Sequence, residues 1–359
     1  MIIEKPVLNE LVRLANAGVS STVVNLTSLM KLICDGDNFK IQTSNNSLFV
    51  ESFAELSDKS APFECYILAR EFARAVALFN RTVKIEPSED GKLLTLSEGN
   101  FSRRLCLMDV AAGAWTFYAD PAETETKKLT QSEKHRLFST LSKMPTDAPV
   151  QPRGVVNFRS AYGVLETTAT DGKKLTQRKI PFENGGGFNV SFLPEIAALV
   201  EAQSSPMEFA TIASNGAEVN KIYFKFDKVK YFAPLQIVNY DTVYGLVDKQ
   251  RQFKDVAFKV KAGELRDSLA KFRDFNRVKF KWGGSCELKL YAASETGNAA
   301  DTVELEESLK GGEVEFDPAL LLTTIANADD DEEMTVRHQL YMFLFEYGCT
   351  FDIVMGLKQ

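Results

Sequence analysis

Residues Phe188–Ala202, FNVSFLPEIAALVEA, join a short alternating apolar stretch to an amphipathic pattern at Pro194. Alternation of apolar and polar residues predicts a strand, and apolar residues at steps of three and four predict a helix. Proline is tolerated in the first turn of a helix, because the N–H that it lacks would have no partner inside the helix. The stretch therefore predicts a strand that runs directly into a helix.

The same pattern occurs in two further stretches, Phe63–Phe79 (FECYILAREFARAVALF) and Gly312–Ala328 (GEVEFDPALLLTTIANA). When Ile67, Phe192 and Phe316 are aligned, the copies are 125 and 124 residues apart, and Pro194 coincides with Pro318. Strand–helix units are common in any α+β protein. The near-equal spacing nevertheless indicates a true triplication.

Each copy has companions at similar distances along the chain. An amphipathic helix is predicted before each copy, at Leu8–Gly18, Leu129–Met144 and Ala262–Phe275. A strand is predicted after each of these helices, at Leu29–Ile33, Val155–Phe158 and Val278–Trp282. A further strand is predicted after each copy, at Val83–Ile85, Met207–Phe209 and Met334–Val336. Hairpin turns are indicated at Glu89-Asp90-Gly91 and Ser214-Asn215-Gly216. We therefore expect an α+β chain of three domains, at about residues 1–121, 122–249 and 250–359, with two helices in each.

The composition is that of a globular chain able to build large cores. Of its 359 residues 45% are hydrophobic and 11% aromatic. The first residues, MIIEKPVLNELVRL, carry charges where a signal peptide needs an apolar stretch. No apolar run approaches the roughly 20 residues that span a bilayer. We expect a cytoplasmic protein without membrane contact.

The residues that usually carry metal or catalytic chemistry are sparse. The five cysteines are scattered without a CxxC pair, at Cys34, Cys65, Cys106, Cys286 and Cys349, and are expected to be buried free thiols. Only two histidines occur, and the GxSxG, P-loop, GxGxxG and HExxH patterns are absent. The sequence predicts a binding protein, with no enzyme activity, no metal site and no cofactor.

Three stretches carry a family resemblance. Residues Val164–Arg178, VLETTATDGKKLTQR, resemble the second-domain strand of the bacterial DNA polymerase III β subunit family, the sliding clamps, whose hallmark turn reads A-T-D-G-x-R-L. Residues Ala292–Leu322 resemble the third-domain segment in which an acidic loop leads to two strands and a helix. The last residues, from Asp352 onward, are similar to the family ending V-V-M-P-M-R-L.

The chain departs from the family pattern at four positions. Lys173 replaces the usual histidine, Lys174 an arginine, Gly356 a proline and Gln359 a terminal leucine. These departures mark a divergent clamp and suit a phage-encoded or otherwise specialised one.

The resemblance implies a DNA-clamp fold in which each domain has two helices on an inner face and antiparallel sheets outside. Two chains would close head to tail into a homodimeric ring around double-stranded DNA, without reading its sequence. The overall charge is −7, yet the helices carry clustered bases expected to face DNA: Arg13, Arg70, Arg74, Arg81, Lys134, Arg136, Lys143, Arg266, Lys271 and Arg273. The alternative is that these are ordinary solvated helix faces.

The resemblance also implies a hydrophobic cleft that takes short peptide motifs from DNA polymerase, the clamp loader and other partners. Carried over residue by residue, the cleft would use Thr170, Gly172, Lys173, Lys174, Leu175, Val247, Ile353, Val354, Met355 and Leu357. Methionine and branched aliphatic side chains make an adaptable surface for several partners. The alternative for the tail is a final core strand with ordinary apolar alternation.

By the same resemblance, the head-to-tail interface joins the first domain of one chain to the third domain of the other. The residues expected at this interface are Arg103, Arg104, Leu105, Leu107, Phe275, Glu295, Asp301 and Glu304. Exposed ion pairs contribute only about 0–1 kcal/mol each, so apolar burial should dominate closure.

Two other classes of function compete with the clamp. A structural or assembly protein, such as a virion component built from repeated α+β modules, would need neither a basic inner face nor a peptide cleft. An enzyme is the weaker alternative. The adjacent carboxylates Glu306 and Glu307 would point to opposite faces of a strand and could not share one substrate.

Overall fold

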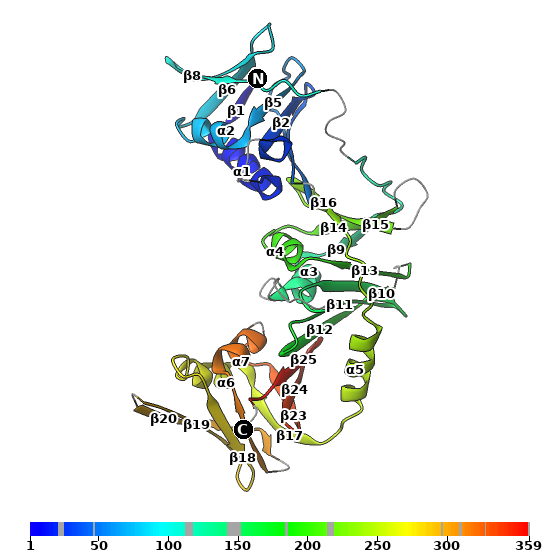
Figure 1. Ribbon diagram of the computed structural model, residues 1–359, viewed down its shortest axis with the longest axis vertical. Coiled ribbons are helices and arrows are strands. Elements are labelled where there is room, and N and C mark those ends of the chain that lie inside the picture. The colour runs from blue at the N-terminus through cyan, green and yellow to red at the C-terminus, as the bar shows by residue number, and fades with distance from the viewer. Residues whose placement is uncertain are drawn as a thin grey trace. The chain divides into compact units, whose positions relative to one another are not determined.

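The chain folds into two compact units. The computed structural model (Figure 1) describes residues 1–20, 25–45, 47–111, 118–141, 152–183, 186–213, 219–295, 297–308, 311–326 and 328–357. One unit comprises Met1–Gln131 and Gln203–Leu235, and the other Ser132–Ala202 and Gln236–Gln359. The three-domain boundaries predicted from the sequence differ from this two-unit division and stay a prediction.

The first unit holds two antiparallel sheets and two α-helices among its described residues. The four-stranded sheet has the order β1-β6-β7-β8, with bounds Ile2–Glu4, Thr82–Pro87, Leu93–Glu98 and Phe101–Cys106. The eight-stranded sheet has the order β5-β2-β3-β4-β16-β15-β14-β9, with bounds Phe63–Leu68, Leu29–Cys34, Asn38–Ser44, Phe49–Glu55, Val229–Pro234, Val219–Lys225, Met207–Ala213 and Lys127–Leu129. The helices are α1 (Lys5–Ala15) and α2 (Ala69–Val76), and their apolar faces share one core with both sheets.

The described residues of the second unit also form two antiparallel sheets. The nine-stranded sheet has the order β13-β10-β11-β12-β25-β24-β23-β17-β21, with bounds Phe188–Phe192, Val156–Ala161, Val164–Thr170, Lys174–Pro181, Thr350–Met355, Met342–Tyr347, Glu333–Gln339, Val256–Lys261 and Glu307–Ser308. The four-stranded sheet has the order β20-β19-β18-β22, with bounds Gly297–Glu304, Glu287–Ser294, Val278–Trp282 and Gly312–Phe316. The helices are α3 (Gln131–Phe138), α4 (Pro194–Glu201), α5 (Asp241–Arg251), α6 (Ala262–Ala270) and α7 (Pro318–Ile325).

The order of the strands confirms the predicted triplication. One pattern of four strands occurs as β5-β2-β3-β4, β13-β10-β11-β12 and β22-β18-β19-β20. A second pattern occurs as β1-β6-β7-β8, β9-β14-β15-β16 and β17-β23-β24-β25. The two larger sheets arise because β4 pairs with β16 and β12 pairs with β25, which joins one copy of each pattern edge to edge.

The three strand–helix stretches fold as predicted, and their local chemistry explains why. Pro194 and Pro318 lie in the first turns of α4 and α7. The Asp317 carboxylate accepts hydrogen bonds from the N–H groups of Ala319 and Leu320, which have no acceptor inside the helix. Apolar residues at helical spacing then face the core on each helix.

One helix differs from the sequence prediction of two helices in each third. The described residues contain a seventh α-helix, α5, which lies alongside the nine-stranded sheet (Figure 1). Its buried side chains include Val243, Tyr244 and Val247. The sequence predicted no helix in this stretch, because α5 lies outside the repeat and no second copy of it marks the pattern.

The cysteines also differ from expectation. Cys34 and Cys65 are buried, whereas Cys106 and Cys286 are exposed and Cys349 is half-buried. Cys106 is exposed because it lies on the outermost strand of its sheet, β8. Among the described residues, no helix is long and apolar enough to cross a membrane, and no group of acidic, histidine and cysteine side chains is arranged to hold a metal ion.

Candidate functional surfaces

The predicted DNA-facing residues of the first unit are exposed. Arg13 lies in the last turn of α1, and Arg70 and Arg74 lie on α2. Arg81 is exposed just after α2, and Arg74 forms an ion pair with Glu71 at 3.3 Å. This unit therefore presents an exposed group of arginines along its two helices.

The predicted DNA-facing residues of α3 lie on two different faces of the helix. Arg136 is exposed, but Lys134 is only 2% exposed and shares the buried face with Leu137 and Phe138. Burial lowers the pKa of the Lys134 ammonium. This placement departs from the expectation that Lys134 faces DNA, and its cause is the three- and four-residue spacing to the buried pair. Lys143 lies outside the described residues.

The predicted residues on and after α6 are mostly paired with acids. Arg266 forms an ion pair with Asp330 at 2.8 Å, and Lys271 forms one with Asp301 at 2.6 Å. Arg273 is exposed and forms no ion pair with the described residues. Neither α4, with the sequence PEIAALVE, nor α7, with PALLLTTI, carries a basic residue. Among the predicted DNA-facing residues that lie within helices, the exposed ones are therefore on α1, α2 and α3.

The turn that carried the family resemblance is built by its own side chains. The Asp171 carboxylate accepts hydrogen bonds from the N–H groups of Lys173 and Lys174, both at 2.8 Å. Gly172 has a φ of +87°, and a Cβ there would lie 2.6 Å from Nε of Arg153. Glycine is therefore favoured at this position by its backbone conformation, and a larger residue would also displace the flexible end of the Arg153 side chain.

The turn and the C-terminal strand lie side by side. Within the pairing of β12 with β25, Leu175 is opposite Ile353 and Lys174 is opposite Val354. The N–H of Met355 donates a hydrogen bond to the carbonyl of Lys173. The structure thus brings together two segments that the sequence analysis placed in one cleft.

Several of the predicted cleft residues are covered, however. Leu175, Val247 and Ile353 are buried in one cluster, in which α5 packs on the sheet. Val354 is buried in a different core, and Lys174 is also buried. Gly172 and Lys173 are exposed, while Thr170, Met355 and Leu357 are half-buried. The accessible part of the predicted surface is therefore the turn and the tail.

Two residues that the sequence analysis missed lie next to this accessible surface. Leu340 is 77% exposed with a φ of +55°, and its neighbour Tyr341 is exposed at the same turn between β23 and β24. The carbonyl of Tyr341 accepts a hydrogen bond from the N–H of Gly356 in the tail. Two large apolar residues at a hairpin turn were the signal that could have identified them. We call Lys173, Met355, Leu357, Leu340 and Tyr341 the tail surface.

The helix side of the same strand pair holds a buried polar network. The Asp352 carboxylate accepts hydrogen bonds from the hydroxyls of Thr176 and Tyr347. The buried Arg178 guanidinium donates to the carbonyl and hydroxyl of Ser139 and to the hydroxyl of Thr140. Burial raises the pKa of Asp352 to about 6, although the nearby charge of Arg178 acts in the opposite direction.

The residues predicted at the chain–chain interface lie on and around two sheet edges. Among the described residues, β8 pairs only with β7, and β20 pairs only with β19. On the first edge, Arg103 and Arg104 are exposed, Leu105 is buried and Leu107 is half-buried. On the second, Glu295 and Glu304 are exposed, Phe275 is half-buried, and Asp301 accepts hydrogen bonds from Ser268 and Lys271.

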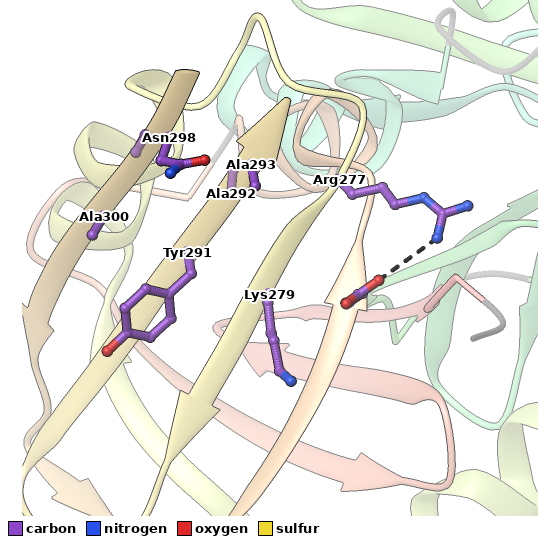
Figure 2. Close-up of a pocket in the computed structure, with 9 residues that line it drawn as sticks. Arg277, Lys279, Tyr291, Ala292, Ala293, Asn298 and Ala300 are labelled. Carbon is purple, nitrogen blue, oxygen red and sulfur yellow. Dashed lines mark ion pairs between the residues drawn. The ribbon is translucent and has the colours of Figure 1, made fainter. Parts of the chain in front are cut away.

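A cavity of about 560 Å³ lies on the outer face of the sheet that ends in β20. Figure 2 shows the side chains that line it, including Tyr291 on β19 and Ala300 on β20. Two cations at its far side are held by acids: Arg277 by Glu315 at 3.7 Å and Lys279 by Glu313 at 2.9 Å. No sequence motif marked this cavity, because its residues come from four strands and are mostly small.

Comparisons with known proteins identify the fold of the chain, but they identify no protein family or curated relative. No protein-family model and no curated protein matches the chain. Similar solved structures include a DNA polymerase sliding clamp from Bacillus subtilis, 17% identical with a TM-score of 0.86, covering 100% of this chain and 98% of that one. They also include a DNA polymerase III subunit beta from Pseudomonas aeruginosa, 15% identical with a TM-score of 0.80, covering 100% of both chains. A putative DNA polymerase III beta subunit from Eubacterium rectale is 14% identical with a TM-score of 0.83, covering 100% of this chain and 99% of that one. The chain therefore has the fold of these clamps along its whole length.

Proposed function

We propose that this protein is a non-enzymatic DNA sliding clamp that acts in the cytoplasm. Two copies would close head to tail into a ring around duplex DNA and tether a polymerase and other partners. The observation that carries this proposal is the pair of open edges, β8 and β20, in a chain whose other equivalent edges are joined in pairs. The full-length likeness to known clamps supports it.

The open edges are equivalent to strands that already pair within the chain. In the first repeated pattern, β4, β12 and β20 occupy the same outer position. In the second, β16, β25 and β8 do so. Since β4 pairs with β16 and β12 with β25, the remaining strands, β20 and β8, are complementary in type. A second copy of the chain supplies the missing partner for each.

Hydrogen-bonded partners across the sheets show which residues are equivalent on the first set of strands. Tyr66, Ser191 and Glu315 each directly precede one of the three aligned repeat residues. In the first copy the cross-strand partners follow the order Tyr66, Lys31, Gln42, Glu51. In the second copy the order is Ser191, Asn157, Thr168, Gln177. In the third copy it is Glu315, Lys279, Tyr291, Ala300. Glu51, Gln177 and Ala300 are therefore equivalent.

The same procedure applies to the second set of strands. In the first copy the cross-strand partners follow the order Lys84, Ser97, Ser102. In the second copy the order is Glu208, Lys225, Lys230. In the third copy it is Thr335, Glu346, Phe351. Within the chain, Glu51 pairs with Lys230 and Gln177 pairs with Phe351. The proposed interface between copies therefore pairs Ala300 with Ser102 in an antiparallel ladder.

DNA contact in the proposed ring would be weak and independent of sequence. Arginines contact phosphates without reading bases, and duplex DNA carries about one negative charge per 1.7 Å of axis. The exposed arginines of α1, α2 and α3 support this role. The acids that pair with Arg266 and Lys271 support a loose contact rather than a tight grip, which suits sliding.

Partner binding would use the tail surface. Leu340, Tyr341 and Leu357 offer exposed or half-buried apolar side chains, and Lys173 adds a charge at the turn. Apolar anchors dominate the affinity of short peptides. A short peptide with leucine or phenylalanine anchors would lie on this surface. The buried cluster of Leu175, Val247 and Ile353 under α5 would support the surface from below.

Electron microscopy of negatively stained protein at high concentration tests the ring. Closed particles with a central hole are expected. Compact particles without a hole, persisting across concentrations, would overturn the proposal and favour a structural module.

Charge reversal tests the DNA surface. The variants Arg70→Glu and Arg136→Glu should each weaken binding of short duplex DNA several-fold at low salt, by fluorescence anisotropy. Lys249→Glu is the matched control, because Lys249 is exposed on α5, which packs on the face of the nine-stranded sheet opposite to α3. Equal losses in all three variants would show that only net charge matters.

A further inference from the structure

The cavity beside β20 has the form of a receptor for a side chain from an added strand. Its outer-face positions on β19 and β20 are small at Ala293 and Ala300, which leaves space above the sheet. The ring of Tyr291 is 43% exposed and leans toward β20 (Figure 2). The cations on the far side are already paired with carboxylates, so the aromatic face is the open surface nearest the sheet edge.

The two strand pairs within the chain show what normally occupies this place. In the first, Phe49 lies opposite Phe232 on the outer face, and Tyr118 covers both at ring distances of 5.2 and 5.8 Å. In the second, Leu175 lies opposite Ile353, and α5 covers them. In both cases a connecting segment of the chain buries an apolar pair.

The pair at the open edges is polar. Two residues along from Ala300 and Ser102 in the antiparallel ladder, Asn298 of one copy lies opposite Arg104 of the other. Opposite residues of an antiparallel pair point to the same face, so Arg104 lies on the outer face with Asn298. No connecting segment crosses between two separate chains to cover this pair, and polar residues suit that exposure.

We propose that the cavity receives the Arg104 side chain of a second copy of this chain, with the guanidinium packed on the ring of Tyr291. This inference rests on the proposed head-to-tail ring. β20 lies between the added β8 and β19, so the two backbones are separated by two strand spacings of about 4.8 Å each. An arginine and a tyrosine that lean toward each other can meet over the small residues of β20. Guanidinium groups stack on aromatic faces. The two cations that line the cavity, Arg277 and Lys279, are already paired with Glu315 and Glu313.

The neighbouring arginine has a different place. Successive residues of a strand point to opposite faces, so Arg103 lies on the helix face. There it is opposite Ala299 and close to Asp301. The two adjacent arginines of β8 therefore divide between the two faces of the continuous sheet, and only Arg104 meets Tyr291.

A double-mutant cycle on the dimer dissociation constant tests the contact. Tyr291→Ala and Arg104→Ala should each raise the dissociation constant about tenfold by sedimentation or mass photometry. The double variant should be no weaker than either single variant. Tyr291→Phe keeps the ring and should remain close to the unmodified protein, and Tyr162→Ala, an exposed tyrosine elsewhere, is the control.

The outcomes separate the contact from the ring. Independent losses from Tyr291→Ala and Arg104→Ala, or no loss from either, in a protein that still dimerises would overturn the contact and leave the ring standing. Coupling of Tyr291→Ala to Arg103→Ala instead would also overturn it, because the register would then be shifted by one residue. A chain that stays monomeric at every concentration would overturn the proposed ring itself.

Discussion

The strand pairs β4·β16 and β12·β25 each join one copy of the first repeated pattern to one copy of the second. Their backbones pair in the same register, but the side chains on the helix face are mainly apolar in β4·β16 and mainly polar in β12·β25. On the helix face of one, Val50 lies opposite Tyr231. At the equivalent place in the other, Thr176 lies opposite Asp352, with Arg178 buried nearby. Hydrogen bonds between main chains set the register in both, and the side chains then determine how each pair responds to pH and substitution.

Only the polar pair, β12·β25, has buried charges whose removal from water must be offset by hydrogen bonds. An aromatic and a valine side chain bury apolar area with few polar groups to satisfy. A buried carboxylate and guanidinium must each be fully hydrogen-bonded, and leaving one without its partners is strongly unfavourable. We therefore expect the β12·β25 pair to be the more sensitive of the two.

The largest effect is expected from Arg178→Met. This change removes the hydrogen bonds to Ser139 and Thr140. It also removes the stronger of the two positive charges that act on the fully buried Asp352, the other being that of Lys174. The free energy of unfolding should fall by about 3–5 kcal/mol, measured by urea denaturation. Arg136→Met, an exposed arginine in the same unit, should change it by less than about 0.5 kcal/mol. Similar small losses in both variants would contradict the assigned importance of the buried network.

The second-largest effect is expected in the pH dependence of the free energy of unfolding. Burial raises the pKa of Asp352 from 3.8 to about 6, so the folded state binds a proton more readily than the unfolded state. The stability that this proton provides is present below about pH 4 and is lost as pH rises through 6. Relative to Asp352→Asn, the unmodified protein should therefore lose about 2 kcal/mol between pH 4 and pH 7. Parallel pH profiles of the two proteins would contradict this.

A smaller effect is expected at the apolar pair. Tyr118→Ala uncovers Phe49 and Phe232 and removes two ring contacts, which should lower the free energy of unfolding by about 1 kcal/mol. The loss should not vary between pH 4 and pH 7, because the described contacts of Tyr118 are with the rings of Phe49 and Phe232 and the ammonium of Lys221, and not with a carboxyl or imidazole group. Thermal denaturation at the two pH values measures both. A pH-dependent loss would show that the two pairs are not chemically distinct.

The smallest net effect is expected from converting the polar pair into an apolar one. The combined variant Thr176→Val, Arg178→Met, Tyr347→Phe and Asp352→Leu removes all four strand residues of the network at once and leaves Ser139 and Thr140 in place. Replacing a complete buried charged network by apolar residues is often neutral or stabilising. The free energy of unfolding should stay within about 1 kcal/mol of the unmodified value, unlike that of Arg178→Met alone. A loss as large as that of the single variant would show that the network itself is required.

The candidate site was only partly predictable from the sequence. Lys134 is buried because α3 turns that side toward Leu137 and Phe138, and composition alone does not say which side of a short helix packs. Arg266 and Lys271 are paired with Asp330 and Asp301, which are 64 and 30 residues away along the chain. Sequence spacing cannot reveal such partners. Val247 belongs to a covered cluster because it lies on α5, a helix outside the repeat.

The sequence by itself determined the repeated architecture, because strand and helix periodicities, turn residues and helix-start prolines act locally and recur at nearly equal intervals. It also determined the Gly172 turn, whose conformation depends on neighbouring residues. Only the tertiary structure decided which edges are joined, which helix cations are paired and where the cavity beside Tyr291 lies. These features depend on residues from distant strands meeting in one register, and that register follows from the hydrogen-bond ladders of the whole sheet.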